Sequence, residues 1–126
     1  MTAKPAPTRE DGTVKVIISN DHSETSCKYA TRERLCNEFR GSEIEVDGTG
    51  SLKPADRDGA NLTHNGQRLA DRLAKIDGAV LLTFNPNSVI VHLDEPHLWD
   101  WESELHPAVL KAFGEAFSTK VQSARA

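Results

Sequence analysis

Residues 67–117 read QRLADRLAKIDGAVLLTFNPNSVIVHLDEPHLWDWESELHPAVLKAFGEAF, and the order of apolar patterns in this stretch predicts an architecture. At its start, Leu69, Leu73 and Ile76 recur at helical spacing, and Asp77-Gly78 then supplies the stop that a left-handed C-cap needs. A helix is therefore expected to begin around residues 63–65 and to end before Gly78.

The pattern then changes to that of two short strands. AVLLTF at 79–84 and SVIVHL at 88–93 are apolar and rich in the β-branched residues that strands favour. The Asn-Pro-Asn link at 85–87 favours a tight reversal. We expect a β-hairpin packed beneath the helix.

A second amphipathic helix follows the hairpin. Asp100 is a suitable N-cap, and an apolar stripe through Phe113 and Phe117 is wide enough to cover a sheet face. Pro107 lacks an amide hydrogen and clashes with the preceding helical turn. The regular helix is therefore expected to begin near Pro107, after a short turn or a kinked start at 101–106.

The first half of the chain carries weaker patterns. VKVIIS at 14–19 predicts a strand with one buried face, and residues 27–31 predict a second strand. Glu-Ile-Glu-Val at 43–46 fits an edge strand or an extended loop, and 47–60 is rich in Gly, Asp and Ser. The expected fold class is α+β, a two-layer β-β-α-β-β-α arrangement in which a mostly antiparallel sheet carries two helices on one face.

One domain accounts for the whole chain, because 126 residues suffice for a single core of ordinary size. We place this domain at residues 13–118, with a long mobile loop at 41–60. The flanking residues 1–12 and 119–126 are predicted to be flexible tails. The first of these lacks the apolar core of a secretory signal, so a cytoplasmic location is expected.

Charge and composition exclude two classes of partner. The formal charge of −4 and the absence of clustered Lys and Arg argue against nucleic acid. No apolar run approaches the length of a membrane span. The sequence also lacks the Gly-x-Ser-x-Gly, phosphate-loop and His-Glu-x-x-His motifs, so no enzymatic activity is expected.

Two segments resemble a known family. LADRLAKIDGAVLLTFNPNSVIVHL followed by DWESELHPAVLKAFGEAF is similar to the N-terminal domain of the Nfu/NifU scaffold family, in which a helix, a turn, a hairpin and an Asp-Trp-x-x-Leu-x-Pro helix occur in this order. Upstream, Ser26-Cys27-Lys28-Tyr29 followed by Leu35 resembles the family's second strand. Residues 21–25 depart from the family pattern, because the expected proline-rich turn is missing.

The resemblance implies an accessory role in iron–sulfur cluster assembly or delivery. Full-length members carry a further domain whose Cys-x-x-Cys motif binds the cluster, whereas this chain contains only Cys27 and Cys36. Iron–sulfur clusters generally need about four thiolate ligands. The implied function is a non-catalytic interaction module without its own cofactor, whose partners are proteins of iron–sulfur cluster assembly or their clients.

An alternative function is direct binding of iron or zinc. Cys27, Cys36 and His22 offer thiolate and imidazole ligands, and a dimer would pool them. Against this, eight residues separate the cysteines. The resemblance also places Cys27 where the family usually has an apolar residue, which implies a small buried side chain. Both interpretations stay open.

Two aromatic residues are candidates for contact with a protein partner. Trp99 precedes the second helix, where an exposed indole can anchor a partner surface. Because the family pattern places a Trp where Trp101 stands, the resemblance assigns Trp101 to packing. Tyr29, in the segment that resembles the family's second strand, is the other candidate.

Overall fold

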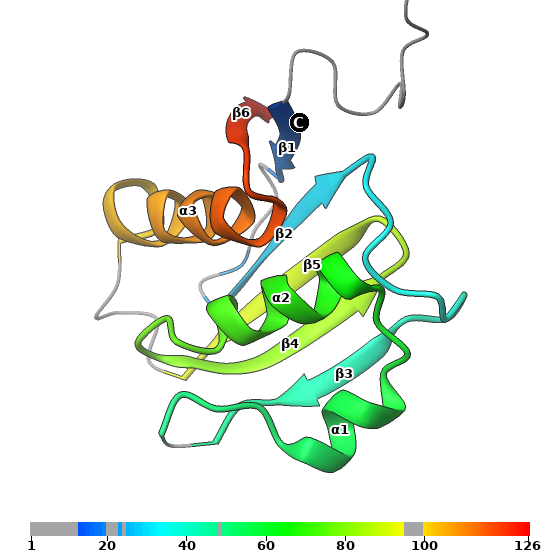
Figure 1. Cartoon of the computed structure of the whole chain (residues 1–126). Coiled ribbons are helices and arrows are strands. Elements are labelled where there is room, and N and C mark those ends of the chain that lie inside the picture. Colours follow the sequence, from blue (N-terminus) through cyan, green and yellow to red (C-terminus); the bar gives the residue numbers. More distant parts are fainter. Residues whose placement is uncertain (1–12, 20–22, 24, 48, 95–99) are drawn as a thin grey trace, which may run out of the picture.

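The computed structural model describes residues 13–19, 23, 25–47, 49–94 and 100–126, and these residues form an α+β fold with a six-stranded sheet (Figure 1). The expected α+β class is thereby confirmed. In chain order the elements are β1 (Thr13–Ile18), β2 (Ser26–Thr31), β3 (Ser42–Glu45), α1 (Pro54–Gly59), α2 (His64–Leu73), β4 (Ala79–Asn85), β5 (Ser88–Leu93), the π-helix η3 (Trp101–Leu105), α3 (His106–Phe117) and β6 (Lys120–Arg125).

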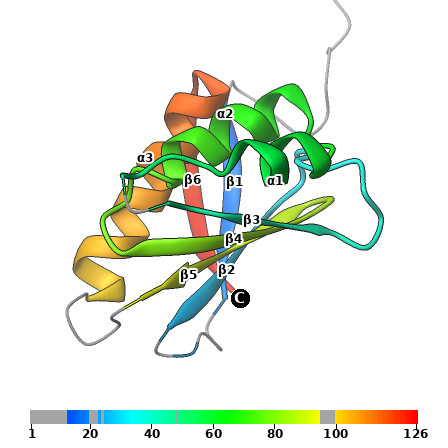
Figure 2. The same ribbon diagram turned by 90° about the horizontal axis from the view of Figure 1, so that it is seen from below.

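The strand order in the sheet is β3-β4-β5-β2-β1-β6. All neighbouring strands are antiparallel except β1 and β6, which are parallel. Helices α2 and α3 lie side by side on one face of the sheet (Figures 1 and 2). The sheet is strongly twisted, so β1 and β6 run steeply across the direction of β3 and β4 in Figure 2.

The core lies between this sheet face and the two helices. The predicted alternation is confirmed in β1, where Val14, Val16 and Ile18 are buried and the residues between them are exposed. On α3, the rings of Phe113 and Phe117 stack with their centroids 6.1 Å apart. Both rings are buried and α3 contacts β1, so the apolar stripe of the sequence faces the sheet, as expected.

Helix α2 begins where a close backbone approach requires glycine. Thr63 is its N-cap, and the Thr63 hydroxyl accepts a hydrogen bond of 3.0 Å from the amide of Gly66. A Cβ atom added at Gly66 would lie only 2.0 Å from the carbonyl oxygen of Leu35. At the other end, the helix stops at Leu73 with Ala74 as a right-handed C-cap, so the prediction that Gly78 caps this helix is wrong. Gly78 does have a left-handed φ of 91°, but it lies in the turn before β4.

Pro107 separates an irregular turn from a regular helix, as predicted. The side chain of Asp100 accepts hydrogen bonds from the amides of Glu102 and Ser103, at 2.9 and 3.3 Å. The turn that follows is the π-helix η3, and α3 begins at His106 with Pro107 in its first turn.

The C-terminal residues form a strand, so the prediction of a flexible tail at 119–126 is wrong. Strand β6 pairs with β1 along its full length, from Thr13 opposite Lys120 to Ile18 opposite Arg125. The sequence KVQSAR lacks an alternating apolar pattern, because nearly all of its side chains are exposed. Backbone pairing with β1 therefore forms this strand.

The expected mobile loop at 41–60 contains two regular elements, β3 and α1. Strand β3 pairs with β4, which settles the choice between an edge strand and a loop at 43–46 in favour of the strand. Helix α1 buries none of its residues and therefore leaves no periodic apolar signal in the sequence. The predicted tail at 1–12 lies outside the described residues.

Candidate interaction surface

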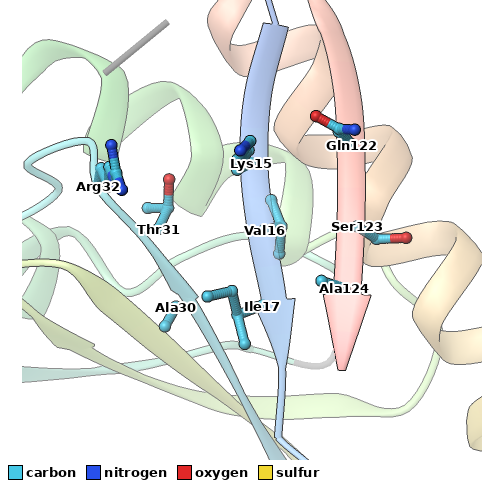
Figure 3. A pocket seen from close by; sticks show the side chains of 9 residues that line it. All are labelled: Lys15, Val16, Ile17, Ala30, Thr31, Arg32, Gln122, Ser123 and Ala124. Atoms are coloured by element: carbon cyan, nitrogen blue, oxygen red, sulfur yellow. The ribbon is translucent and has the colours of Figure 1, made fainter. Parts of the chain in front are cut away.

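The second face of the sheet is not covered by any described helix, and a shallow concavity of about 410 Å³ lies on it over β6, β1 and β2 (Figure 3). The helices lie behind the strands in this view. The side chains that shape the concavity are Lys15 and Ile17 of β1, Ala30 of β2, Arg32, and Gln122 and Ala124 of β6.

Register explains why the surface is hollow here. Ile17 pairs with Ala30 on one side and with Ala124 on the other, so a large apolar side chain stands between two small ones. The small neighbours leave Ile17 45% exposed, one of the most exposed large apolar side chains in the described chain. The floor of the concavity is therefore an apolar row across three strands.

The upper edge of the concavity is cationic. Lys15 pairs with Gln122 in the row next to Ile17, and Arg32 follows the end of β2. The lining includes no Asp or Glu, although the whole chain carries a formal charge of −4. The concavity therefore complements a ligand that combines an apolar group with a carboxylate.

The lining of the concavity combines apolar and polar side chains. It contains no Cys, His, Asp or Glu, and its hydroxyl groups are those of Thr31 and Ser123. An apolar floor with a few polar groups at its edge is typical of a binding surface.

Tyr29, a candidate partner contact, belongs to the core instead. Its ring is fully buried on the helix face of β2, and its hydroxyl shares a hydrogen bond of 2.8 Å with Nδ1 of His106. Nε2 of His106 lies 3.6 Å from Oε2 of Glu102, and the other carboxylate oxygen of Glu102 pairs with Arg125. Burial, followed by the neighbouring Cys27, raises the pKa of Tyr29. Tyr29 therefore connects the sheet to the start of α3 and contributes nothing to an exposed surface.

The two cysteines lie in separate surroundings. Sγ of Cys27 is 3.9 Å from the carbonyl oxygen of Ser19, and burial raises the pKa of this thiol. Sγ of Cys36 donates to the carbonyl oxygen of Ala60 at 3.3 Å. Both side chains are buried.

No metal centre is formed by the described part of the chain. It contains no group of three or more His, Cys, Asp or Glu residues placed to hold a metal ion. His22, the third candidate ligand, lies outside the described residues. The alternative of iron or zinc bound through Cys27 and Cys36 therefore gains no support from these contacts.

Trp99 also lies outside the described residues, and its predicted role stays a prediction. The contribution of Ala30 and Ala124 to this surface was not anticipated. The alternation of buried residues in β1 predicted that Lys15 and Ile17 lie on the face opposite the core. Strand β6, which forms one side of the concavity, was not predicted.

No protein-family model matches the sequence, and a search among curated proteins finds no match. The likeness to the Nfu/NifU family therefore stays a prediction from the motifs. Within the described residues, no helix is both long enough and apolar enough to cross a membrane.

Proposed function

We propose that this chain is a protein-interaction module that binds its partner at the concavity over β6, β1 and β2. We call it the open-face concavity, because no described helix covers this face of the sheet, and we call its apolar floor and cationic edge the docking surface. The observation that supports the proposal is the apolar row of Ile17, Ala30 and Ala124 beside two cations, on an acidic chain. Surfaces of this composition, with an apolar centre and a charged edge, are typical of protein contacts.

The energetics favour a contact of modest affinity. Covering the exposed part of Ile17 contributes roughly 1 kcal/mol, and an inserted Leu or Phe of the partner contributes about 1.5–3 kcal/mol. A carboxylate near Lys15 and Arg32 adds specificity and a faster encounter more than affinity. Most of the binding energy is therefore expected from the apolar contact between Ile17 and the inserted side chain of the partner.

The iron–sulfur role remains part of the proposal. By the resemblance, the partners are proteins of iron–sulfur cluster assembly or their clients, and binding rather than catalysis is the function. Immobilised protein is incubated with purified cluster scaffold and carrier proteins, and retention is measured. If the immobilised protein retains one of these proteins and loses it when Ile17 is changed, the result supports this partner class. If it retains none of them, the partner class is rejected, whereas the docking surface is tested separately.

The docking surface is tested by substitution of one exposed side chain. Ile17→Glu places a carboxylate on the apolar floor, and Val80→Glu is the matched control because Val80 is similarly exposed, at 38%, on β4 outside the concavity. Affinity capture with quantitative mass spectrometry compares both variants with the wild type. Partners retained by the wild type and by Val80→Glu but lost by Ile17→Glu support the proposal. Equal retention by all three proteins would contradict it.

A further inference from the structure

The two edges of the sheet differ. At the β3 edge, Lys53 donates its amide to the carbonyl oxygen of Glu45 at 3.0 Å, and Oδ2 of Asp56 accepts from the amide of Glu45 at 3.0 Å. Lys53 and helix α1 therefore occupy both backbone groups of Glu45 at the end of this edge strand.

The β6 edge has no such cover in the described part of the chain, where β6 is the last strand of the sheet. The amide of Ala126 donates to the carbonyl oxygen of Ile18 at 3.0 Å. Since backbone groups alternate in direction along a parallel ladder, Val121, Ser123 and Arg125 direct theirs away from β1. Five of the six β6 residues are exposed. β6 therefore presents N–H and C=O groups to an added strand.

We propose that β6 accepts an extended acidic segment of a partner protein as a seventh strand. This inference rests on the proposed function, because the added strand would lie at the border of the open-face concavity. Strand addition is a common mode of peptide recognition, in which backbone hydrogen bonds give affinity and alternate side chains give specificity.

Register gives the pattern of the segment. On the open face, the side chains of an added strand would stand beside Gln122 and Ala124, which are two residues apart. Gln122 pairs with Lys15 and Ala124 pairs with Ile17, so the added side chains would extend the Lys15 row and the Ile17 row of the sheet. A carboxylate is favoured in the Lys15 row, and an apolar side chain is favoured in the Ile17 row. The segment therefore carries an acidic and an apolar residue separated by one position.

A second copy of this chain does not fit that pattern. Its own β6, KVQSAR, contains no carboxylate to place in the Lys15 row, and its Arg125 is already paired with Glu102. A second β6 edge would therefore supply Lys15 and Lys120 with no partner of opposite charge, whereas an acidic segment supplies one. Charge complementarity thus favours a different protein over self-association.

The test uses the labelled, capped peptide Thr-Glu-Thr-Leu-Thr-Glu-Thr, which offers the pattern in both chain directions, and its counterpart with Lys in place of Glu. Ser123→Pro removes one outward N–H, at an edge position that tolerates proline, and Ser123→Ala is its control. By fluorescence anisotropy, the wild type and Ser123→Ala should bind the acidic peptide equally. Ser123→Pro should bind it about tenfold more weakly, a loss of about 1.4 kcal/mol.

A second measurement keeps the test decisive if proline disturbs β6. Two N-methylated forms of the acidic peptide are prepared, one blocked at the odd residues and one at the even residues, and both are titrated into the wild-type protein. Strand addition predicts that one form loses binding and the other retains it, because only alternate amides face β6.

Three results would overturn the inference. They are equal binding of both methylated peptides, no binding of the acidic peptide by the wild type, or self-association of the wild type that Ser123→Pro abolishes. None of these results contradicts the proposed function if, in the affinity capture, Ile17→Glu still fails to retain the partners that the wild type retains. If Ile17→Glu retains those partners, the docking surface itself fails.

Discussion

Tyr29→Phe removes one buried hydroxyl and keeps the ring. The wild-type hydroxyl is 2.8 Å from Nδ1 of His106, and both side chains are buried. Deleting such a bond costs about 1 kcal/mol net, and desolvation of the remaining buried group raises the cost to about 1–3 kcal/mol. For a chain of this size, a loss of about 2 kcal/mol corresponds to a Tm lower by roughly 6–10 °C.

Thr83→Val is a matched control for this change. The Thr83 hydroxyl also contacts a histidine, with 3.0 Å between its oxygen and Nε2 of His92, but both side chains are only half-buried. Its loss is expected to cost less than about 1 kcal/mol, because water replaces the bond. Calorimetry and urea unfolding of the two variants give the comparison. An equal cost for both substitutions would contradict the structural role of the buried pair.

The burial of Tyr29 also gives a prediction about pH that absorbance can test. Tyr29 is the only tyrosine, so tyrosinate absorbance reports on it alone. Burial raises its pKa above the ordinary value of about 10. Stability from the neutral form is therefore full below pH 10 and is lost as the pH rises further, because the unfolded state ionises first. Ionisation should coincide with alkaline unfolding. Ionisation near pH 10 in the folded protein would refute the reasoning.

Three further predictions concern other parts of the fold. Gly66→Ala should cost more than about 3 kcal/mol in urea unfolding, because the added Cβ would meet the Leu35 carbonyl at 2.0 Å; a loss under about 1 kcal/mol would contradict this. Asp100→Ala should lower the stability at neutral pH, and the difference should vanish in acid, because hydrogen bonds from Ser103 and Glu102 lower the pKa of the Asp100 carboxyl and its capping contribution is lost as the pH falls through that pKa. Thermal melts from pH 7 to pH 2 measure the difference, and a constant gap would count against it. Both cysteines should react with a thiol reagent only after unfolding, because they are buried and burial raises the pKa of Cys27; rapid reaction of the native protein would disprove their burial.

The fold was predictable where one face of an element is buried. The hairpin of β4 and β5, helix α2 after Thr63 and the helix that begins near Pro107 all carry periodic apolar residues or a cap, and all are present. Strand β6 and helix α1 bury few or no side chains, so their formation depends on backbone pairing and on neighbouring segments. A periodicity analysis cannot detect such elements.

The candidate surface was less predictable than the fold. Ile17 was readable as an outward-facing residue of β1, but its neighbours Ala30 and Ala124 come from strands far apart in the sequence. Tyr29 was misleading, because a polar aromatic residue looks suited to a surface until its buried partner His106 is known. Both cases depend on contacts between distant segments, which the local pattern does not encode.

Photo-crosslinking tests the docking surface most directly. A photo-reactive benzoylphenylalanine is placed at Gln122, which lines the concavity, or at Lys111, an exposed residue of α3 on the opposite face of the sheet. We predict partner adducts from position 122 that disappear with Ile17→Glu, and none from position 111. Adducts from position 111 alone, or adducts from position 122 that persist with Ile17→Glu, would contradict the account.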